Sequence, residues 1–311
     1  METKPVLLNA HTQLELAGLS HLCPSGPVPF TSWVGRMSWN RFRLLPTRIH
    51  FGVLQGIREL KKSGTTHVWD VTATGASVTP LLGSGLEGII FLEVRGLGIK
   101  KARSRLRLVQ EHIRFIRQRH RGRRFEAGLF LHAPYSCHPD LLREGAAWSL
   151  REGIPLGIRV AESPAETELL TSGQIASISP LYRCMARLKR AWPDRIPGQR
   201  PIPFLDSLGV LDARPILVHA VDLTDDEIDL IARKGCSVVH CPRSNERLTC
   251  GRMPLEKFLQ AGVPVRLGTG TPTSIPDLDI RKEMAFAKRF HQEKVDSQAI
   301  EGLIHQPLDR F

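Results

Sequence analysis

Short apolar segments alternate with longer amphipathic segments along almost the whole chain. The short ones are rich in apolar residues without strict alternation, which is typical of strands buried on both faces of a parallel sheet. The sequence predicts strands over residues 5–10, 66–71, 88–93, 126–131, 155–160, 215–219, 237–240 and 264–267. Between them, apolar residues at helical spacing predict helices over 48–63, 77–82, 140–152, 224–234, 254–261 and 278–293, and one within 100–124.

Strands that alternate with helices in this way predict an α/β fold, a (β/α)8 TIM barrel formed by residues 1–311 as a single domain. An open, doubly wound sheet is the competing arrangement. No G-x-G-x-x-G motif follows a predicted strand, so a dinucleotide-binding sheet has no support. Two Pro-containing segments, about 20–46 and 171–213, interrupt the alternation after a strand. We expect both to lie over the C-terminal mouth of the barrel as lids or partner surfaces.

Composition narrows the setting in which the protein works. No run of about 18 apolar residues is present, so we expect no membrane span, and the first residues do not resemble a secretory signal. The six cysteines are scattered and form no C-x-x-C pair, which favours a reducing, cytoplasmic location. Cys236, Cys241 and Cys250 lie closest together, but their spacing is not that of a structural zinc site.

Positive charge is concentrated in one segment. The net charge is +12, and residues 100–124 hold eleven Lys and Arg against one acid, Glu111, which gives 11 − 1 = +10. Leu106, Val109, Ile113 and Ile116 form an apolar helix stripe there, so the basic residues form the outer face. A solvated helix face is one interpretation. The other is an anionic partner such as RNA, a membrane surface or an acidic protein, although no nucleic-acid-binding motif accompanies the charge.

Polar residues stand where the predicted strands end. A barrel builds its active site at this face from the ends of several strands, so residues in these positions are candidates for chemistry. They are His11, His132, Arg159, Glu162, His219 and His240, with Gly270 after the last strand.

The sequence resembles the amidohydrolase superfamily, in the branch of the adenosine-type and aminofutalosine deaminases and the triazine chlorohydrolases. The motifs that carry the resemblance occur in order: NAHTQLEL, PFTSWV, GTT, HAPYS, AESPAE, SVVHCPRSN and LGTG. The resemblance implies a catalytic metal, usually zinc or iron, which lowers the pKa of a bound water. It also implies a small β-sandwich, for which this sequence shows no strands, so we expect a barrel that lacks it.

The resemblance places four metal ligands, and three of these positions differ here. His11 matches the first ligand, whereas Gln13, Arg159 and Gly270 stand where the family has His, His and Asp. A guanidinium about 4 Å from a divalent ion repels it by roughly 8 kcal/mol at an effective dielectric of 20. We therefore expect no zinc or iron cofactor, with Glu162 as the counter-ion of Arg159.

The family's proton-handling pair is retained as Glu162 and His219, which are candidate acid and base residues. We expect a deaminase-like protein that is metal-free and catalytically impaired and keeps a pocket for a nucleoside-like, carboxylate- or phosphate-bearing ligand. The residues expected to bind this ligand are His11, His132, Arg159, His240 and Arg243. One alternative is an active C–N hydrolase that uses His11, Glu162 and His219 with an altered metal set. The other is an anionic-polymer binder acting through 100–124.

Overall fold

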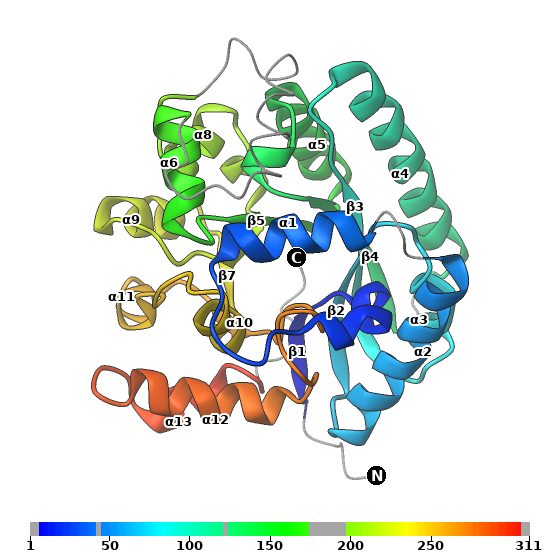
Figure 1. Ribbon diagram of the computed structural model, residues 1–311. Helices are drawn as coiled ribbons and strands as arrows, with labels where there is room; N and C mark the ends of the chain where they lie inside the picture. Colours follow the sequence, from blue (N-terminus) through cyan, green and yellow to red (C-terminus); the bar gives the residue numbers. More distant parts are fainter. Residues whose placement is uncertain (1–5, 42–44, 121–123, 174–196, 306–311) are drawn as a thin grey trace.

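A computed structural model describes residues 6–41, 45–120, 124–173 and 197–305. Eight parallel strands follow one another in chain order around a nearly closed barrel (Figure 1). Between the first and last strands, Thr12 bridges Gly270 in parallel and the Gly270 N–H donates to the His11 carbonyl at 2.9 Å. The strands are β1 Leu8–Thr12, β2 His67–Thr72, β3 Glu87–Val94, β4 Phe125–Leu131, β5 Leu156–Val160, β6 Ile216–His219, β7 Ser237–His240 and β8 Val265–Leu267.

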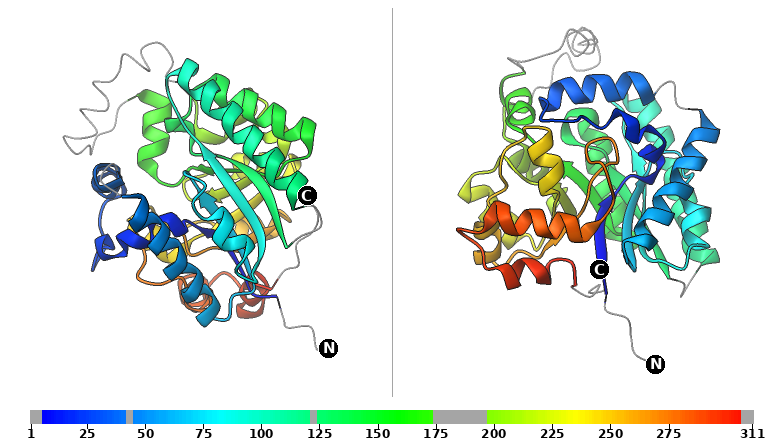
Figure 2. Two further views of the ribbon diagram at one scale, coloured as in Figure 1. Left: turned by 90° about the vertical axis from the view of Figure 1, so that its right-hand side faces the viewer. Right: turned by 60° about the horizontal axis from the view of Figure 1, so that its bottom comes forward.

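Helices surround this ring (Figures 1 and 2). The α-helices are α1 Phe30–Arg41, α2 Pro46–Lys62, α3 Val78–Leu82, α4 Ile99–Arg119, α5 Pro139–Glu152, α6 Pro164–Ser172, α8 Pro201–Ser207, α9 Asp225–Arg233, α10 Pro242–Arg247, α11 Leu255–Gln260, α12 Ile280–His291 and α13 Ser297–Gly302. Short 3-10 helices are η1 Leu14–Leu22, η2 Pro134–Ser136 and η4 Leu211–Ala213. No helix among these described residues is long and apolar enough to cross a membrane.

The predicted (β/α)8 barrel is confirmed, and the sequence patterns explain where its elements begin and end. Thr224 and Glu227 form a capping box at the start of α9, where each side chain accepts from the other's backbone N–H. α5 ends at Glu152 and is followed by Gly153, whose φ of 59° suits glycine. The first strand runs two residues further than predicted. The prediction missed the 3-10 helices η1, η2 and η4 and the α-helices α1, α8, α10 and α13, because they lie in loops or are too short to show helical periodicity.

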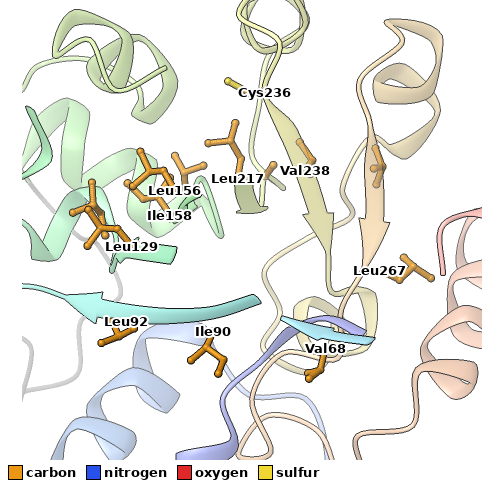
Figure 3. Close-up of a cluster of buried hydrophobic side chains, with 14 of the residues drawn as sticks. Val68, Ile90, Leu92, Leu129, Leu156, Ile158, Leu217, Cys236, Val238 and Leu267 are labelled. Atoms are coloured by element: carbon orange, nitrogen blue, oxygen red, sulfur yellow. The ribbon is translucent and has the colours of Figure 1, made fainter. Parts of the chain in front are cut away.

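Alternate strand residues face either the helices or the barrel interior. Figure 3 shows part of the outer set, in which Val68, Ile90 and Leu129 point from the strands toward the surrounding helices. The inner set includes Trp69, Phe91, Phe130, Val218 and Val239. These apolar side chains fill the ring, so the interior is a packed core.

Two glycines make room for the largest inner side chains. A Cβ on Gly128 would lie 2.6 Å from the Phe91 ring, and one on Gly157 would lie 2.6 Å from the Phe130 ring. Because real Cβ atoms do not approach so closely, these positions on β4 and β5 require glycine. Phe130 consequently fills the centre of the barrel next to Arg159, whose guanidinium carbon lies 5.0 Å from the centre of its ring.

The segment about 20–46 contains α1, which lies across the open end of the barrel in Figure 1. The Trp33 indole N–H donates to the Thr273 carbonyl at 3.0 Å, and Phe30 packs on Leu248 and Cys250. These contacts join α1 to the loops that follow β7 and β8. In the other interrupting segment, residues 174–196 lie outside the described residues.

Candidate functional site at the strand ends

A buried ion pair joins β3 and β5 inside the barrel. The Arg159 guanidinium donates to Glu93 Oε2, at 3.3 Å from Nη2 and 3.5 Å from Nη1, and to the His132 carbonyl at 3.3 Å. Glu93 follows Ile89 and Phe91 on the inward-facing side of β3, and Arg159 follows Gly157 on that of β5. The expectation that Glu162 would be the counter-ion of Arg159 was wrong, because Glu93 occupies that place.

Glu162 instead contacts His219. Glu162 Oε1 lies 3.4 Å from His219 Nε2, and His219 Nδ1 lies 2.9 Å from Asn245 Oδ1. An amide oxygen only accepts, so Nδ1 carries hydrogen and the contact at Nε2 is favourable when one proton is shared with the carboxylate. Burial lowers the pKa of His219, while the Glu162 carboxylate opposes this effect. The pair is therefore arranged to exchange a proton with a bound molecule.

Unusual backbone geometry brings this pair together. Ala161, His219 and Ala220 have φ values of 50°, 79° and 48°, in the left-handed region that non-glycine residues rarely adopt. These residues follow the ends of β5 and β6, or form the last position of β6, so the chain turns sharply there. Left-handed positions of this kind concentrate at functional sites, where the surrounding structure compensates for their strain.

His11 lies between the ion pair and the proton-handling pair. Its ring stacks on Phe130 with centroids 5.9 Å apart and meets the His219 ring edge-on at 6.0 Å. Burial lowers the pKa of His11 well below its ordinary value, and the Arg159 charge lowers it further. His11 is therefore a neutral imidazole at physiological pH, able to accept or donate one hydrogen bond.

His132 follows β4 next to these groups. His132 Nδ1 lies 2.7 Å from Ser136 Oγ, which fixes the ring by a hydrogen bond within the H-A-P-Y-S motif. The backbone carbonyl of His132 also accepts from Arg159, so the end of β4 is joined to the ion pair. His11, His132, Arg159, Glu162 and His219 thus come from the ends of four strands and lie at one end of the barrel.

Two candidate ligand-binding residues have other partners. His240 follows the inward-facing Val239, so its ring faces away from the interior, and its Nε2 lies 3.1 Å from Nε2 of His291 on α12. The Arg243 guanidinium is engaged by two acids, with Nη1 3.1 Å from Asp277 Oδ1 and Nε 3.6 Å from Glu283 Oε2. The structure does not bring His240 to the cluster around His11, and Arg243 serves a neighbouring ion-pair network.

The four positions that the resemblance assigns to metal ligands do not fit a divalent ion. His11 offers an imidazole nitrogen, but Gln13 offers only a neutral amide and Arg159 offers donors alone. Gly270 has no side chain, and its φ of 79° is one that an aspartate adopts only with strain. No group of three or more His, Cys, Asp or Glu within the described ranges could hold a metal.

The sequence did not predict that Glu93, Asn245 and Cys241 lie near this cluster. Glu93 had a signal, because it is a charged residue in the apolar segment GIIFLEV and shares the parity of Ile89 and Phe91. Cys241 shares the inward parity of Val239, and burial raises the pKa of its thiol well above the ordinary value. Asn245 ends the SVVHCPRSN motif, but the motif alone gave no reason to pair it with His219.

Comparison with known proteins gives a consistent family assignment. The amidohydrolase family matches residues 4–301. An aminodeoxyfutalosine deaminase of Deinococcus radiodurans is 32% identical over 298 residues, covering 92% of this chain and 68% of the relative. A 5-methylthioadenosine/S-adenosylhomocysteine deaminase of Pelotomaculum thermopropionicum is 28% identical, covering 94% of this chain and 62% of the relative. The chain thus spans about two thirds of the length of these relatives.

Solved structures agree on the fold. A zinc-bound adenosine deaminase from Xanthomonas campestris matches with a TM-score of 0.76 at 23% identity, over 96% of this chain and 62% of that one. A Helicobacter pylori aminofutalosine deaminase in complex with methylthio-coformycin matches with a TM-score of 0.74 at 20% identity, over 94% and 68%. At these identities the structural likeness supports the barrel fold, and the chemistry of the site is inferred from its own residues.

Proposed function

Because this chain belongs to the amidohydrolase family, we propose that its strand-end site binds an adenine-type nucleoside next to Glu162 and His219. The observation that carries the proposal is the buried contact between these two side chains, with Asn245 fixing the histidine. An adenine ring offers nitrogen atoms that accept a proton and an amino group that donates one. A carboxylate–imidazole pair that shares a proton complements both kinds of group.

The names of the relatives support the same ligand class. Curated relatives covering 92–94% of this chain are named as deaminases of aminodeoxyfutalosine or of 5-methylthioadenosine and S-adenosylhomocysteine. Each of these names denotes a nucleoside with a modified 5′ position. We therefore propose that the pocket takes a 5′-substituted purine nucleoside and not a free phosphate, because Arg159 is already engaged by Glu93.

We propose that hydrolysis by a metal-bound water is absent or weak at this site. The chemistry of Gln13, Arg159 and Gly270 supports this part of the proposal, since none offers the anionic or imidazole ligand that a divalent ion requires. The zinc or iron of the family would add a water of lowered pKa if it were bound. Glu162, His219 and Asn245 would by themselves bind the base and move one proton.

An active deaminase is the second candidate, and the names of the relatives favour it over loss of activity. In that case Glu162 would take a proton from water as the oxygen bonds to the purine carbon. The carbon–nitrogen bond would then break, and ammonia would leave with the transferred proton. The contact between Glu162 and His219 supports this exchange, and His11 would complete the set as a neutral hydrogen-bond partner.

Titration of 5′-methylthioadenosine and adenosine into the purified protein, with ammonia measured in parallel, separates these candidates. Saturable heat without ammonia supports a binding protein, and ammonia that disappears in Glu162→Ala supports an active deaminase. Glu168→Ala changes a half-buried carboxylate on α6 and is the matched control. If neither nucleoside binds, the proposal is contradicted. Ammonia release that is unaffected by Glu162→Ala contradicts it as well.

A further inference from the structure

The basic side chains of α4 face two different environments. On the flank next to α5, Arg114 Nη2 lies 2.8 Å from Glu152 Oε1, and Arg103 Nε lies 2.8 Å from Glu144 Oε1. The charges on this flank are therefore largely balanced by acids of α5. The positive charge noted in the sequence is consequently not spread over the whole helix.

The opposite flank carries an unbalanced set of cations with two large apolar side chains between them. These residues recur every three or four positions along α4 and are exposed, so they form one straight stripe: Lys101, Arg105, Leu108, His112, Phe115 and Arg119. Leu108 is 65% exposed and Phe115 is 54% exposed. Within the part of the chain that the structure describes, no acid forms an ion pair with Lys101, Arg105 or Arg119. We call this set the α4 stripe.

A short neighbouring helix explains why the α4 stripe is uncovered. α3 has 5 residues whereas α4 has 21, so the helix that precedes α4 around the barrel cannot cover its length. Figures 1 and 2 show α4 projecting past α3 on the outside of the barrel. The apolar core face of α4, with Leu106 and Ile113, is buried, and Leu108 and Phe115 lie outside that face.

We propose that the α4 stripe docks the protein on the surface of a bilayer that contains anionic lipids. The stripe extends from Lys101 to Arg119, and these 18 helical steps of 1.5 Å span about 27 Å. Leu108 and Phe115 lie two turns apart on one face and are positioned to enter the boundary between headgroups and acyl chains. Lys101, Arg105 and Arg119 surround them at the level where anionic headgroups would neutralise their charge.

A bilayer fits the stripe better than the other anionic surfaces. Most contacts of a nucleic-acid-binding surface go to phosphate oxygens, which the cations of the stripe could make but Leu108 and Phe115 could not. An acidic protein would need a groove shaped to a convex helix about 27 Å long. A bilayer surface adapts to a convex helix. It buries apolar groups and attracts cationic groups at the same time, and the stripe presents both.

Sedimentation with vesicles tests this inference on the full chain. The probes are phosphatidylcholine vesicles and vesicles with 30% phosphatidylserine, at low and physiological salt. We expect binding to the anionic vesicles only, weakened several-fold by salt because exposed charges are screened. Equal binding to both vesicle types, or none to the anionic vesicles at low salt, overturns the inference. Tighter binding to a single-stranded RNA than to the anionic vesicles overturns it as well.

Variants separate the charge and the apolar contributions. Lys101→Glu/Arg105→Glu should lower vesicle binding at least tenfold, since each cation near an anionic surface contributes about 1 kcal/mol, or about fivefold. Arg233→Glu/Arg289→Glu makes the same charge change on exposed residues of α9 and α12 and should have a smaller effect. Equal losses in the two double variants overturn the inference.

The apolar contribution is tested with Leu108→Ser/Phe115→Ser. The control is Leu150→Ser, which removes an apolar side chain that is 57% exposed on α5. The stripe variant should bind several-fold more weakly at every salt concentration, whereas Leu150→Ser should bind like the parent protein. Circular dichroism and thermal melting check that the variants are folded. A folded stripe variant with unchanged binding overturns the inference.

Discussion

The Arg159 guanidinium is held by the Glu93 carboxylate inside the barrel, with 3.3 Å between Nη2 and Oε2. Only 8% of the Arg159 side chain and 1% of the Glu93 side chain is exposed. Removing one member of such a pair leaves a buried charge without compensation, at a cost of about 3–5 kcal/mol. The contributions of the two residues to stability are therefore coupled, and the effect of a substitution at one position depends on the residue at the other.

Arg159→Met and Glu93→Leu should each lower the free energy of unfolding by about 3–5 kcal/mol, measured by urea denaturation. Arg159→Met/Glu93→Leu should be more stable than the sum of the two single effects predicts, because neither charge is then left unpaired. Arg103→Ala removes an exposed pair with Glu144 and should leave the urea midpoint nearly unchanged. Additive losses in the double variant would show that the pair is not coupled.

Metal content follows from the donors at the strand ends. The purified protein should contain well under one equivalent of zinc or iron by elemental analysis. Restoring the family's ligands as Gln13→His/Arg159→His/Gly270→Asp should recover binding, at some loss of stability because Gly270 has a φ of 79°. Arg159→His alone should not recover it. A tightly held, stoichiometric metal in the parent protein would contradict the proposal.

The buried pair His240 and His291 should make stability depend on pH. Burial lowers the pKa of His291 from its ordinary 6.5 to about 4, and it lowers the pKa of His240 well below 6.5. Between about pH 6.5 and 4 the unfolded chain therefore binds more protons than the folded one, so stability falls as the pH is lowered through this window. Stability from these groups is complete above pH 6.5.

His291→Phe should reduce this acid sensitivity, because it removes one titrating group and keeps an aromatic ring next to Phe290. Thermal midpoints measured from pH 7.5 to 4.5 provide the comparison, with the exposed His50→Phe as control. A parent midpoint that stays level down to pH 4.5 would contradict the pKa directions.

Gly157→Ala should destabilise the barrel and disturb the site together. The new Cβ would lie 2.6 Å from the Phe130 ring, so this ring must move. The Arg159 guanidinium and the His11 ring both pack against Phe130 and would be displaced with it. We expect a loss of about 1–3 kcal/mol, as for other overpacked cores, and weaker nucleoside binding. Gly26→Ala, where nothing lies within 4 Å, is the control. Unchanged stability and binding would argue against this packing role.

The sequence predicted the barrel well because its signals are local and repeated. Each strand is a short apolar segment, and boundaries such as the Thr224 cap depend on neighbouring residues only. The deaminase-type family assignment was likewise confirmed, since the motifs occur in order along the chain. The charge pattern predicted the surface of the basic helix less well, because the acids that pair with Arg103 and Arg114 come from another helix.

The site was harder to predict because its pairings are not local. Glu162 lies three residues after Arg159, yet the partner of Arg159 is Glu93, 66 residues earlier in the chain. Strand parity contained part of the answer, since it places Glu93 and Arg159 on the inner side and His240 on the outer side. The turn at His219 could not be foreseen, because a φ of 79° in a histidine depends on the surrounding fold.

The junction between β1 and β8 has a consequence for how the ring is completed. It is held by Gly270 N–H to the His11 carbonyl at 2.9 Å, and by two hydrogen bonds between Asn9 and Thr269 at 2.9 and 3.0 Å. These contacts join residues about 260 positions apart, so this seam cannot form until nearly the whole barrel has been synthesised. A metal held by His11 and an aspartate at 270 would cross-link the seam. Here the hydrogen bonds across the seam come from the Asn9 and Thr269 side chains and from the backbone, and the first and last strands should be where the ring opens most readily.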